Sequence, residues 1–267
     1  MKFEVITIFP DFFRGPFDFG IIRRAKESGL VEINIHDLRA FTKDKHRTVD
    51  DRPFGGGEGM VLKPEPIFEC IESLGLCGAD TLVREKRESI ILLSASGQPF
   101  DQRMAAELAQ LDRVTIICGR YEGVDERVAQ QLADREISIG DFVLSGGELA
   151  AALIVDTVTR LIPGALGNEA SSKQESFTHG EHVMEGVPSS TCGSGGLLDY
   201  PHYTRPAEFR GMSVPEPLLN GNHEEIKRWR RKEALRKTLR HRPELLDEAG
   251  LSKEDRKLLK ELREEKV

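Results

Sequence analysis

Three glycine-rich segments, residues 55–59, 119–123 and 139–147, are the places in this sequence where a ligand could most easily be held. The second segment follows directly on an apolar run that ends at Cys118. Glycines beyond the carboxyl ends of covered strands let the backbone approach a ligand closely and leave its amides and carbonyls free to bind it. Each segment alone could be an ordinary tight turn. Together they predict a nucleotide-like ligand held by main-chain groups.

These segments lack the two familiar phosphate-binding patterns. None matches GxxxxGK[ST], and none is a GxGxxG turn between a strand and a helix. P-loop NTPases and nicotinamide enzymes of the ordinary Rossmann type are therefore disfavoured. The four cysteines, at 70, 77, 118 and 192, form no CxxC pair, which disfavours a zinc site or a disulfide framework. We expect free thiols and a cytoplasmic location.

Arg160 is a candidate for chemistry because of its place on a helix. Residues 149–162 predict a helix that is apolar nearly all round and closed by Pro163 and Gly164. A helix without a polar face is buried, either centrally or against a second subunit. Asp156 lies four residues before Arg160, so the two form an ion pair or the helix end delivers the arginine into a site.

Alternating strand and helix patterns must position these residues. Strand patterns occur at 3–9, 31–38, 89–94 and 114–118, and helix patterns at 18–28, 64–74, 101–111 and 124–133. The run at 89–94 is apolar at almost every position, as strands covered on both faces are. This order predicts an α/β domain with a mostly parallel sheet.

Composition excludes several classes of protein. Of the 267 residues, 39% are hydrophobic and 31% charged, which is ordinary for a globular protein. The longest unbroken apolar run covers residues 149–155, far short of the roughly 20 residues of a membrane span. The first ten residues lack the basic start and long apolar stretch of a signal peptide. We therefore expect no membrane partner.

Positive charge is concentrated near the C-terminus. Between residues 226 and 243, nine Lys and Arg stand against one acid, so this segment carries +8. Since the whole chain carries −7, the rest carries −15. A solvated face is one interpretation, but segregated charge favours contact with a polyanion. Trp229 lies among these cations and could stack on a base or belong to a small core.

Three regions follow from these patterns. Residues 167–196 are polar and rich in Gly and Ser, which is typical of a linker or lid. Helices follow, one beginning near Asn222, one opened by Pro243 and one by a capping box of Ser252 and Asp255. We expect an α/β domain at 1–166, a flexible linker or lid at 167–196, and a small helical domain at 197–267.

The sequence resembles the bacterial tRNA (guanine-N1)-methyltransferase family over essentially its whole length. Five segments carry the resemblance, in the family's order: KDKHRTVDDRPFGGGEGM (43–60), CGRYEGVDER (118–127), SIGDFVLSGGE (138–148), DYPHYTRP (199–206) and NHEEIKRWRRKEAL (222–235). The resemblance implies S-adenosylmethionine-dependent methylation of N1 of the guanine at position 37 of tRNA, immediately 3′ of the anticodon. It also implies a SPOUT fold: an α/β domain with a mostly parallel sheet and a deep trefoil knot, then a small all-α domain, in a homodimer with the active site between subunits.

The resemblance also assigns binding residues. It places S-adenosylmethionine in a pocket lined by Leu92, Leu93, Ser94, Gly119, Tyr121, Glu122, Gly123, Ser138, Ile139, Gly140, Asp141, Phe142, Val143, Leu144, Gly146 and Gly147. It places Asp50, Arg120 and Tyr121 near the target base. The phosphates of the tRNA stem-loop would contact Lys227, Arg228, Arg230 and Arg231.

Two catalytic roles are implied as well. Glu175 corresponds to the family's general base, usually an aspartate, and Arg160 would stabilise negative charge on the guanine. Residues 178–195 form an insertion relative to the family's usual linker. The family implies some Mg²⁺ dependence; we find no closed metal site, and Glu122 is an open candidate. A SPOUT methyltransferase for another RNA position and an RNA-binding relative without catalysis are the alternatives.

Overall fold

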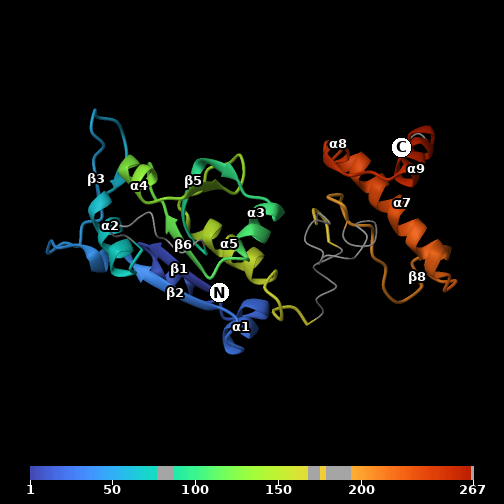
Figure 1. Ribbon diagram of the computed structural model, residues 1–267, viewed down its shortest axis with the longest axis horizontal. Coiled ribbons are helices and arrows are strands. Elements are labelled where there is room, and N and C mark those ends of the chain that lie inside the picture. Colours follow the sequence, from blue (N-terminus) through green and yellow to red (C-terminus); the bar gives the residue numbers. More distant parts are fainter. Residues whose placement is uncertain (77–86, 168–174, 179–193, 266–267) are drawn as a thin grey trace. The chain divides into compact units, whose positions relative to one another are not determined.

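The structure is a computed structural model of the chain and describes residues 1–76, 87–167, 175–178 and 194–265 (Figure 1). It divides into two compact units, Met1–Gly167 and Asn168–Val267, called the first and second units below. Across the described ranges, no helix is both long enough and apolar enough to span a membrane.

A five-stranded parallel sheet forms the centre of the first unit (Figure 1). Its strands are β1 (Lys2–Thr7), β2 (Glu32–Asp37), β5 (Glu88–Pro99), β6 (Arg113–Cys118) and β7 (Arg135–Ser138), in the order β2-β1-β6-β5-β7. The predicted α/β class with a mostly parallel sheet is confirmed. β7 was not among the predicted strands, because its four residues, REIS, contain a single large apolar side chain.

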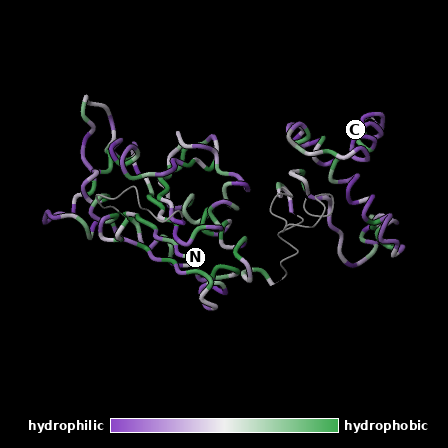
Figure 2. Tube along the Cα trace, in the orientation of Figure 1, coloured by the Kyte–Doolittle hydropathy of each residue, from purple (hydrophilic) through white to green (hydrophobic). Residues whose placement is uncertain are grey.

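Helices cover both faces of this sheet. α1 (Gly20–Glu27), α3 (Gln102–Leu108) and α5 (Glu148–Thr159) pack against one face, and α2 (Pro64–Ser73) and α4 (Glu126–Gln131) against the other. Successive strand side chains point to opposite faces. Ile91 and Leu93 of β5 therefore join the core under α5, while Ile90 and Leu92 join the core under α2. Figure 2 shows hydrophobic and hydrophilic residues interspersed in the first unit; residues 90–93 of β5 are apolar at every position because both faces are buried there.

A short hairpin connects the glycine-rich segment 55–59 to the sheet. β3 (Asp50–Asp51) pairs with β4 (Val61–Leu62) in antiparallel fashion, and Leu62 forms a further bridge to Val124 beyond β6. The glycines lie between the two strands of the hairpin, and Phe54 beside them is 99% exposed. The hairpin thus reaches the carboxyl end of the sheet.

The second unit is built mainly from helices. These are α7 (His223–His241), α8 (Leu245–Glu248) and α9 (Lys253–Glu264), around a core of Leu197, Leu235, Leu246, Leu258, Leu259 and Leu262. Asn222 caps α7, and Ser252 and Asp255 form the predicted capping box of α9. A two-residue hairpin, β8 (Glu208–Phe209) and β9 (Met212–Ser213), was not predicted.

Two of the four cysteines lie within the described residues. Cys70 and Cys118 are buried free thiols, as expected for them. Burial raises the pKa of the Cys70 thiol to about 12 and, with the charge of Glu148, raises the pKa of Cys118 well above its ordinary value. Cys77, Cys192 and most of the predicted linker at 167–196 lie outside the described residues.

Candidate functional site

A cavity of about 440 Å³ opens where β6, β5 and β7 end side by side in the first unit. All of the predicted cofactor residues except Gly140 and Asp141 line it. Gly140 lies in the same loop, where its N–H donates to Ser138 Oγ at 3.3 Å. The sequence reasoning missed lining residues adjacent to the predicted ones: Ala95, Ser96, Val124, Glu126, Ala129, Glu136, Ile137, Ser145 and Ala150. Arg120, predicted to lie near the target base, also lines the cavity.

Two glycines let backbone segments of the cavity wall touch. A Cβ at Gly147 would lie 2.8 Å from Cys118 Cα, and the Gly147 N–H donates to the Gly119 carbonyl at 2.9 Å. A Cβ at Gly97 would lie 2.4 Å from the Ile137 nitrogen. Because real Cβ atoms do not approach backbone so closely, only glycine fits at these crossings.

The turn after β6 is held against the β3–β4 hairpin. The Glu122 N–H donates to the Met60 carbonyl, and the Leu62 N–H donates to the Gly123 carbonyl, both at 3.1 Å. Tyr121, directly before Glu122, has a φ of 58°, a left-handed conformation that is uncommon for a bulky residue. Half of its surface is exposed at the mouth of the cavity. Asp50, opposite Leu62 in the hairpin, is thereby brought to the same edge of the sheet.

A buried carboxylate supports Arg120 at the rim. Glu148, the first residue of α5, is only 3% exposed; its Oε2 lies 3.5 Å from Arg120 Nη1, and its Oε1 accepts a hydrogen bond from Thr7 Oγ1 at 2.8 Å. The helix N-terminus also favours a negative charge there. The Arg120 guanidinium lies 4.8 Å from the centre of the Phe9 ring. Sequence reasoning missed Glu148; an acid directly after Gly-Gly at the start of an apolar helix was the available signal.

Arg160 stands at the other end of α5. It is the C-cap residue of the helix, and its N–H donates to the Asp156 carbonyl at 3.2 Å. A helix rises about 1.5 Å per residue, so the twelve residues of α5 separate Arg160 from Glu148 by about 18 Å. Within one copy of the first unit, Arg160 is therefore remote from the Glu148 side of the cavity.

Glu175 belongs to the second unit. Its neighbours pair with residues at and just before the start of the DYPHYTRP segment: the Phe177 N–H donates to the Leu197 carbonyl at 3.0 Å, and the Asp199 N–H donates to Ser176 Oγ at 2.8 Å. Glu175 itself is partly exposed. The cavity lies in the first unit, so the role of Glu175 stays a prediction.

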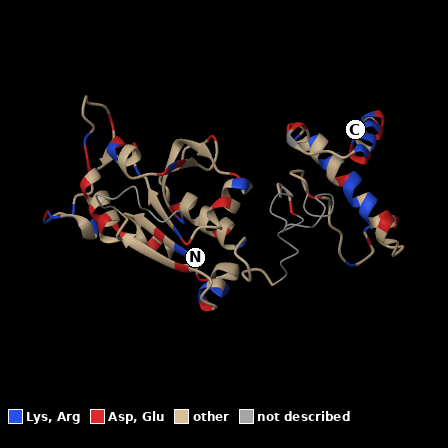
Figure 3. Cartoon of the chain, in the orientation of Figure 1, with Lys and Arg blue, Asp and Glu red and all other residues tan. Residues whose placement is uncertain are grey.

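Figure 3 shows Lys and Arg along α7 in blue; by their partners, these residues fall into two groups. Arg231 makes a bidentate contact with Asp255 of α9, at 2.7 and 3.0 Å, and Lys232 lies 2.6 Å from Glu265. Burial alone would raise the pKa of Asp255, but hydrogen bonds from Arg231 and Ser252 lower it below its ordinary value. In contrast, Lys227, Arg228 and Arg230 have no carboxylate within 4.0 Å among the described residues. Arg231, one of the four predicted phosphate contacts, is therefore already paired with Asp255 inside the second unit.

The described part of the chain contains no group of three His, Cys, Asp or Glu side chains placed to hold a metal ion. Glu122 lines the cavity, as do Glu126 and Glu136, but none of these carboxylates belongs to such a group. We derive no chemical step from a metal, and the Mg²⁺ dependence stays a prediction.

Comparisons with known proteins point in one direction. The family model described as "tRNA (Guanine-1)-methyltransferase TrmD" matches residues 1–248. A relative from Koribacter versatilis is 65% identical over 98% of both chains. A relative from Dictyoglomus turgidum is 50% identical over 99% of this chain and 98% of its own, and one from Dehalococcoides mccartyi is 51% identical over 98% and 97%. Each of these three relatives is named tRNA (guanine-N(1)-)-methyltransferase.

Proposed function

The chain belongs to the tRNA (guanine-1)-methyltransferase family and methylates N1 of guanine 37 in tRNA, and we propose that S-adenosylmethionine bound in the cavity at the ends of β5, β6 and β7 is its methyl donor. The observation that carries this proposal is the cavity itself. It combines apolar walls with closely approaching backbone at a place where α/β proteins bind ligands.

The lining residues fit such a cofactor. Leu92, Phe142 and Leu144 offer apolar contacts for an adenine ring, and the glycine-lined crossings at 119 and 147 bring main-chain groups to its edges. When bound, S-adenosylmethionine supplies an electrophilic methyl group on a sulfonium. The protein must then orient the guanine and manage the proton on N1.

Glu175 and Arg160 divide that task. The Glu175 carboxylate would take the proton from N1 and so free the N1 electron pair to accept the methyl group that the sulfonium would supply as its sulfur–methyl bond is given up. Arg160 balances the negative charge that builds on the guanine carbonyl oxygen. The products are N1-methylguanine, the demethylated cofactor and a protonated carboxyl on Glu175.

A homodimer completes this site. Because α5 holds Arg160 about 18 Å from Glu148, we infer that the Arg160 serving the cavity comes from a second copy of the chain. α5 also exposes Leu149 (55%) and Leu153 (42%), four residues apart on one face. Exposed leucines on a helix whose opposite face is buried fit a subunit interface at α5.

Two finer features of the fold are part of the proposal. A SPOUT knot in the C-terminal part of the α/β domain is supported by the tight crossings at Gly97 and Gly147 and by the pairing of Arg120 with Gly146. In this proposal, residues 1–166 form the cofactor-binding domain, residues 167–196 a linker or lid, and residues 197–267 a helical tRNA-binding domain. Lys227, Arg228 and Arg230 would hold phosphates of the stem-loop, in a cytoplasmic enzyme.

The test uses two tRNA transcripts that differ only at position 37. With labelled S-adenosylmethionine, we expect methyl transfer to the transcript with guanine and none to a transcript with adenine there. Equal transfer to both would assign the enzyme to another RNA position. Calorimetry without RNA tests the donor separately, because a cavity that binds no S-adenosylmethionine would overturn that part of the proposal.

A further inference from the structure

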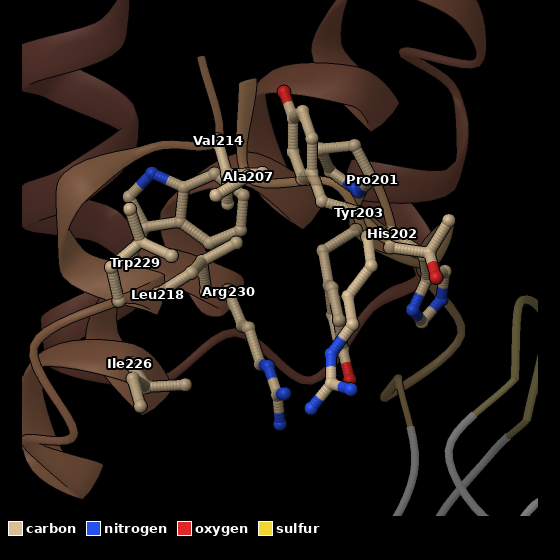
Figure 4. Close-up of a pocket in the computed structure, with 13 residues that line it drawn as sticks. Pro201, His202, Tyr203, Ala207, Val214, Leu218, Ile226, Trp229 and Arg230 are labelled. Atoms are coloured by element: carbon tan, nitrogen blue, oxygen red, sulfur yellow. The ribbon is translucent and has the colours of Figure 1, made fainter. Parts of the chain in front are cut away.

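A second pocket, of about 490 Å³, lies within the second unit and has no part in the chemistry described above (Figure 4). One wall is the face of α7 that carries Ile226, Trp229 and Arg230, which are three and four residues apart. The opposite wall is the extended segment 200–207. Leu218, from the short helix η6 (Glu216–Leu218), and Val214 complete the lining.

Aromatic side chains dominate this pocket. The rings of Tyr203 and Trp229 lie 6.2 Å apart at 58°, and those of Tyr200 and His202 lie 4.7 Å apart. Trp229 is absent from the leucine core of the second unit and only partly buried, and Tyr203 is 50% exposed. Figure 4 places Trp229 and Ile226 on one side of the pocket and Tyr203 and His202 on the other. Open ring faces of this kind are stacking surfaces for a planar ligand.

The charged side chains that line the pocket are positive. Its lining contains Arg205 and Arg230 and no Asp or Glu. The Arg230 guanidinium lies over the Tyr200 ring, 4.9 Å from its centre, and both residues line the pocket. Lys227 and Arg228, on the same half of α7, have no carboxylate partner among the residues described. A ligand with a flat aromatic part and attached negative charge matches these features, as a nucleotide within RNA does.

We propose that this pocket receives an unpaired nucleobase of the bound tRNA, distinct from the target guanine. The base stacks on the Tyr203 ring and meets the inclined ring of Trp229 at its edge, and Arg230 contacts the adjacent phosphate. The inference rests on the proposed function, since it takes tRNA as the substrate, and adds a base contact to the phosphate contacts of α7. Unpaired loop bases suit the role because bases within a duplex are not free to stack on protein side chains.

Trp229 makes this proposal directly measurable, because it is the single tryptophan of the chain. The full-length protein is titrated with a labelled tRNA transcript, and both the binding anisotropy and the tryptophan emission are recorded. Further transcripts each carry one abasic nucleotide in the anticodon loop. The variants are Tyr203→Ala, Tyr203→Phe and, as a matched control, Phe209→Ala, which removes an equally exposed aromatic ring outside the pocket lining.

We expect the transcript to quench Trp229 emission, and one abasic position to abolish the quenching. Tyr203→Ala should weaken transcript binding about 5- to 150-fold, the range for loss of one stacked base, while Tyr203→Phe and Phe209→Ala bind as the unaltered protein does. Binding without any change in Trp229 emission would overturn the proposal, and this reading needs no variant. A Tyr203→Ala protein that binds the transcript normally would overturn it as well. So would a Tyr203→Ala protein whose weaker binding is explained entirely by a change in its monomer–dimer equilibrium. Failure of the proposed function would appear separately, as absent methyl transfer by the unaltered protein.

Discussion

The side chains of Arg120 and Glu148 face each other at the rim of the cavity at the ends of β5, β6 and β7, with Arg120 Nη1 3.5 Å from Glu148 Oε2. They come from segments 28 positions apart in the sequence, the turn after β6 and the first residue of α5. Thr7 of β1 binds the other carboxylate oxygen at 2.8 Å. One buried carboxylate therefore joins three elements beneath the rim.

Glu148→Gln tests this junction. The change keeps the size of the side chain but removes the charge opposite Arg120, and we expect the free energy of unfolding to fall by about 1–3 kcal/mol. Urea denaturation measures the loss, and calorimetry measures a parallel weakening of S-adenosylmethionine binding. Glu69→Gln is the control, since its pair with Lys43 is largely exposed and should contribute at most about 1 kcal/mol. Equal losses in both variants would contradict a special role for Glu148.

Gly147→Ala tests the crossing behind the cavity. The added Cβ would lie 2.8 Å from Cys118 Cα, so the backbone must move, at a cost of about 1–3 kcal/mol in stability. We expect S-adenosylmethionine affinity to fall with it, because the displaced segment forms the cavity wall. Gly167→Ala has no atom within 4 Å of its added Cβ and serves as the matched control. The idea fails if the two alanine variants bind the cofactor equally well.

Glu175→Gln tests the general base. The amide cannot accept the N1 proton, so the single-turnover methylation rate should fall about 10²- to 10⁴-fold while cofactor affinity is kept. Glu175→Asp restores the carboxylate that the family usually has at this position, and it should be far more active than the Gln variant. Activity that survives in Glu175→Gln would place the base elsewhere.

Arg228 and Arg231 should respond differently although they lie one turn apart on α7. Arg231→Ala leaves the buried Asp255 without its cation, and we expect the second unit to lose about 1–3 kcal/mol of stability. Arg228→Ala should leave stability unchanged but weaken tRNA binding, with the slope of log affinity against log salt reduced by about 1. Urea denaturation and binding titrations at several salt concentrations separate the two roles. Identical effects would refute the division of α7 into two groups.

The pKa of Asp255 also predicts how stability depends on pH. Hydrogen bonds from Arg231 and Ser252 outweigh burial and lower this pKa below its ordinary value of 3.8. A carboxyl whose pKa is lower in the folded state stabilises that state fully above its ordinary pKa. The contribution is lost as the pH falls through the lowered value. Followed by Trp229 fluorescence in urea, the stability gap between the unaltered protein and Asp255→Asn should narrow on acidification below about pH 4; a constant gap would contradict the assignment.

Local patterns in the sequence were enough for much of the first unit. Strand and helix periodicity predicted β1, β2, β5 and β6 and the helices between them, because a side-chain period reports which face of an element is buried. The caps at Asn222 and Ser252 were predictable because capping uses neighbours in the chain. The strand β7 was not predicted because its four residues are too few to show a side-chain period.

The sequence alone determined the fold class, the segregation of positive charge onto one helix and the glycine-rich turns that now surround the cavity. Only the tertiary structure decided that Glu148 supports Arg120, that α9 engages Arg231 but not Arg228, and that Trp229 lines a pocket instead of joining the leucine core. The physical reason is the range of the interactions. Secondary structure and caps depend on neighbours along the chain, whereas the partner of a charge or ring depends on which distant segment packs against it.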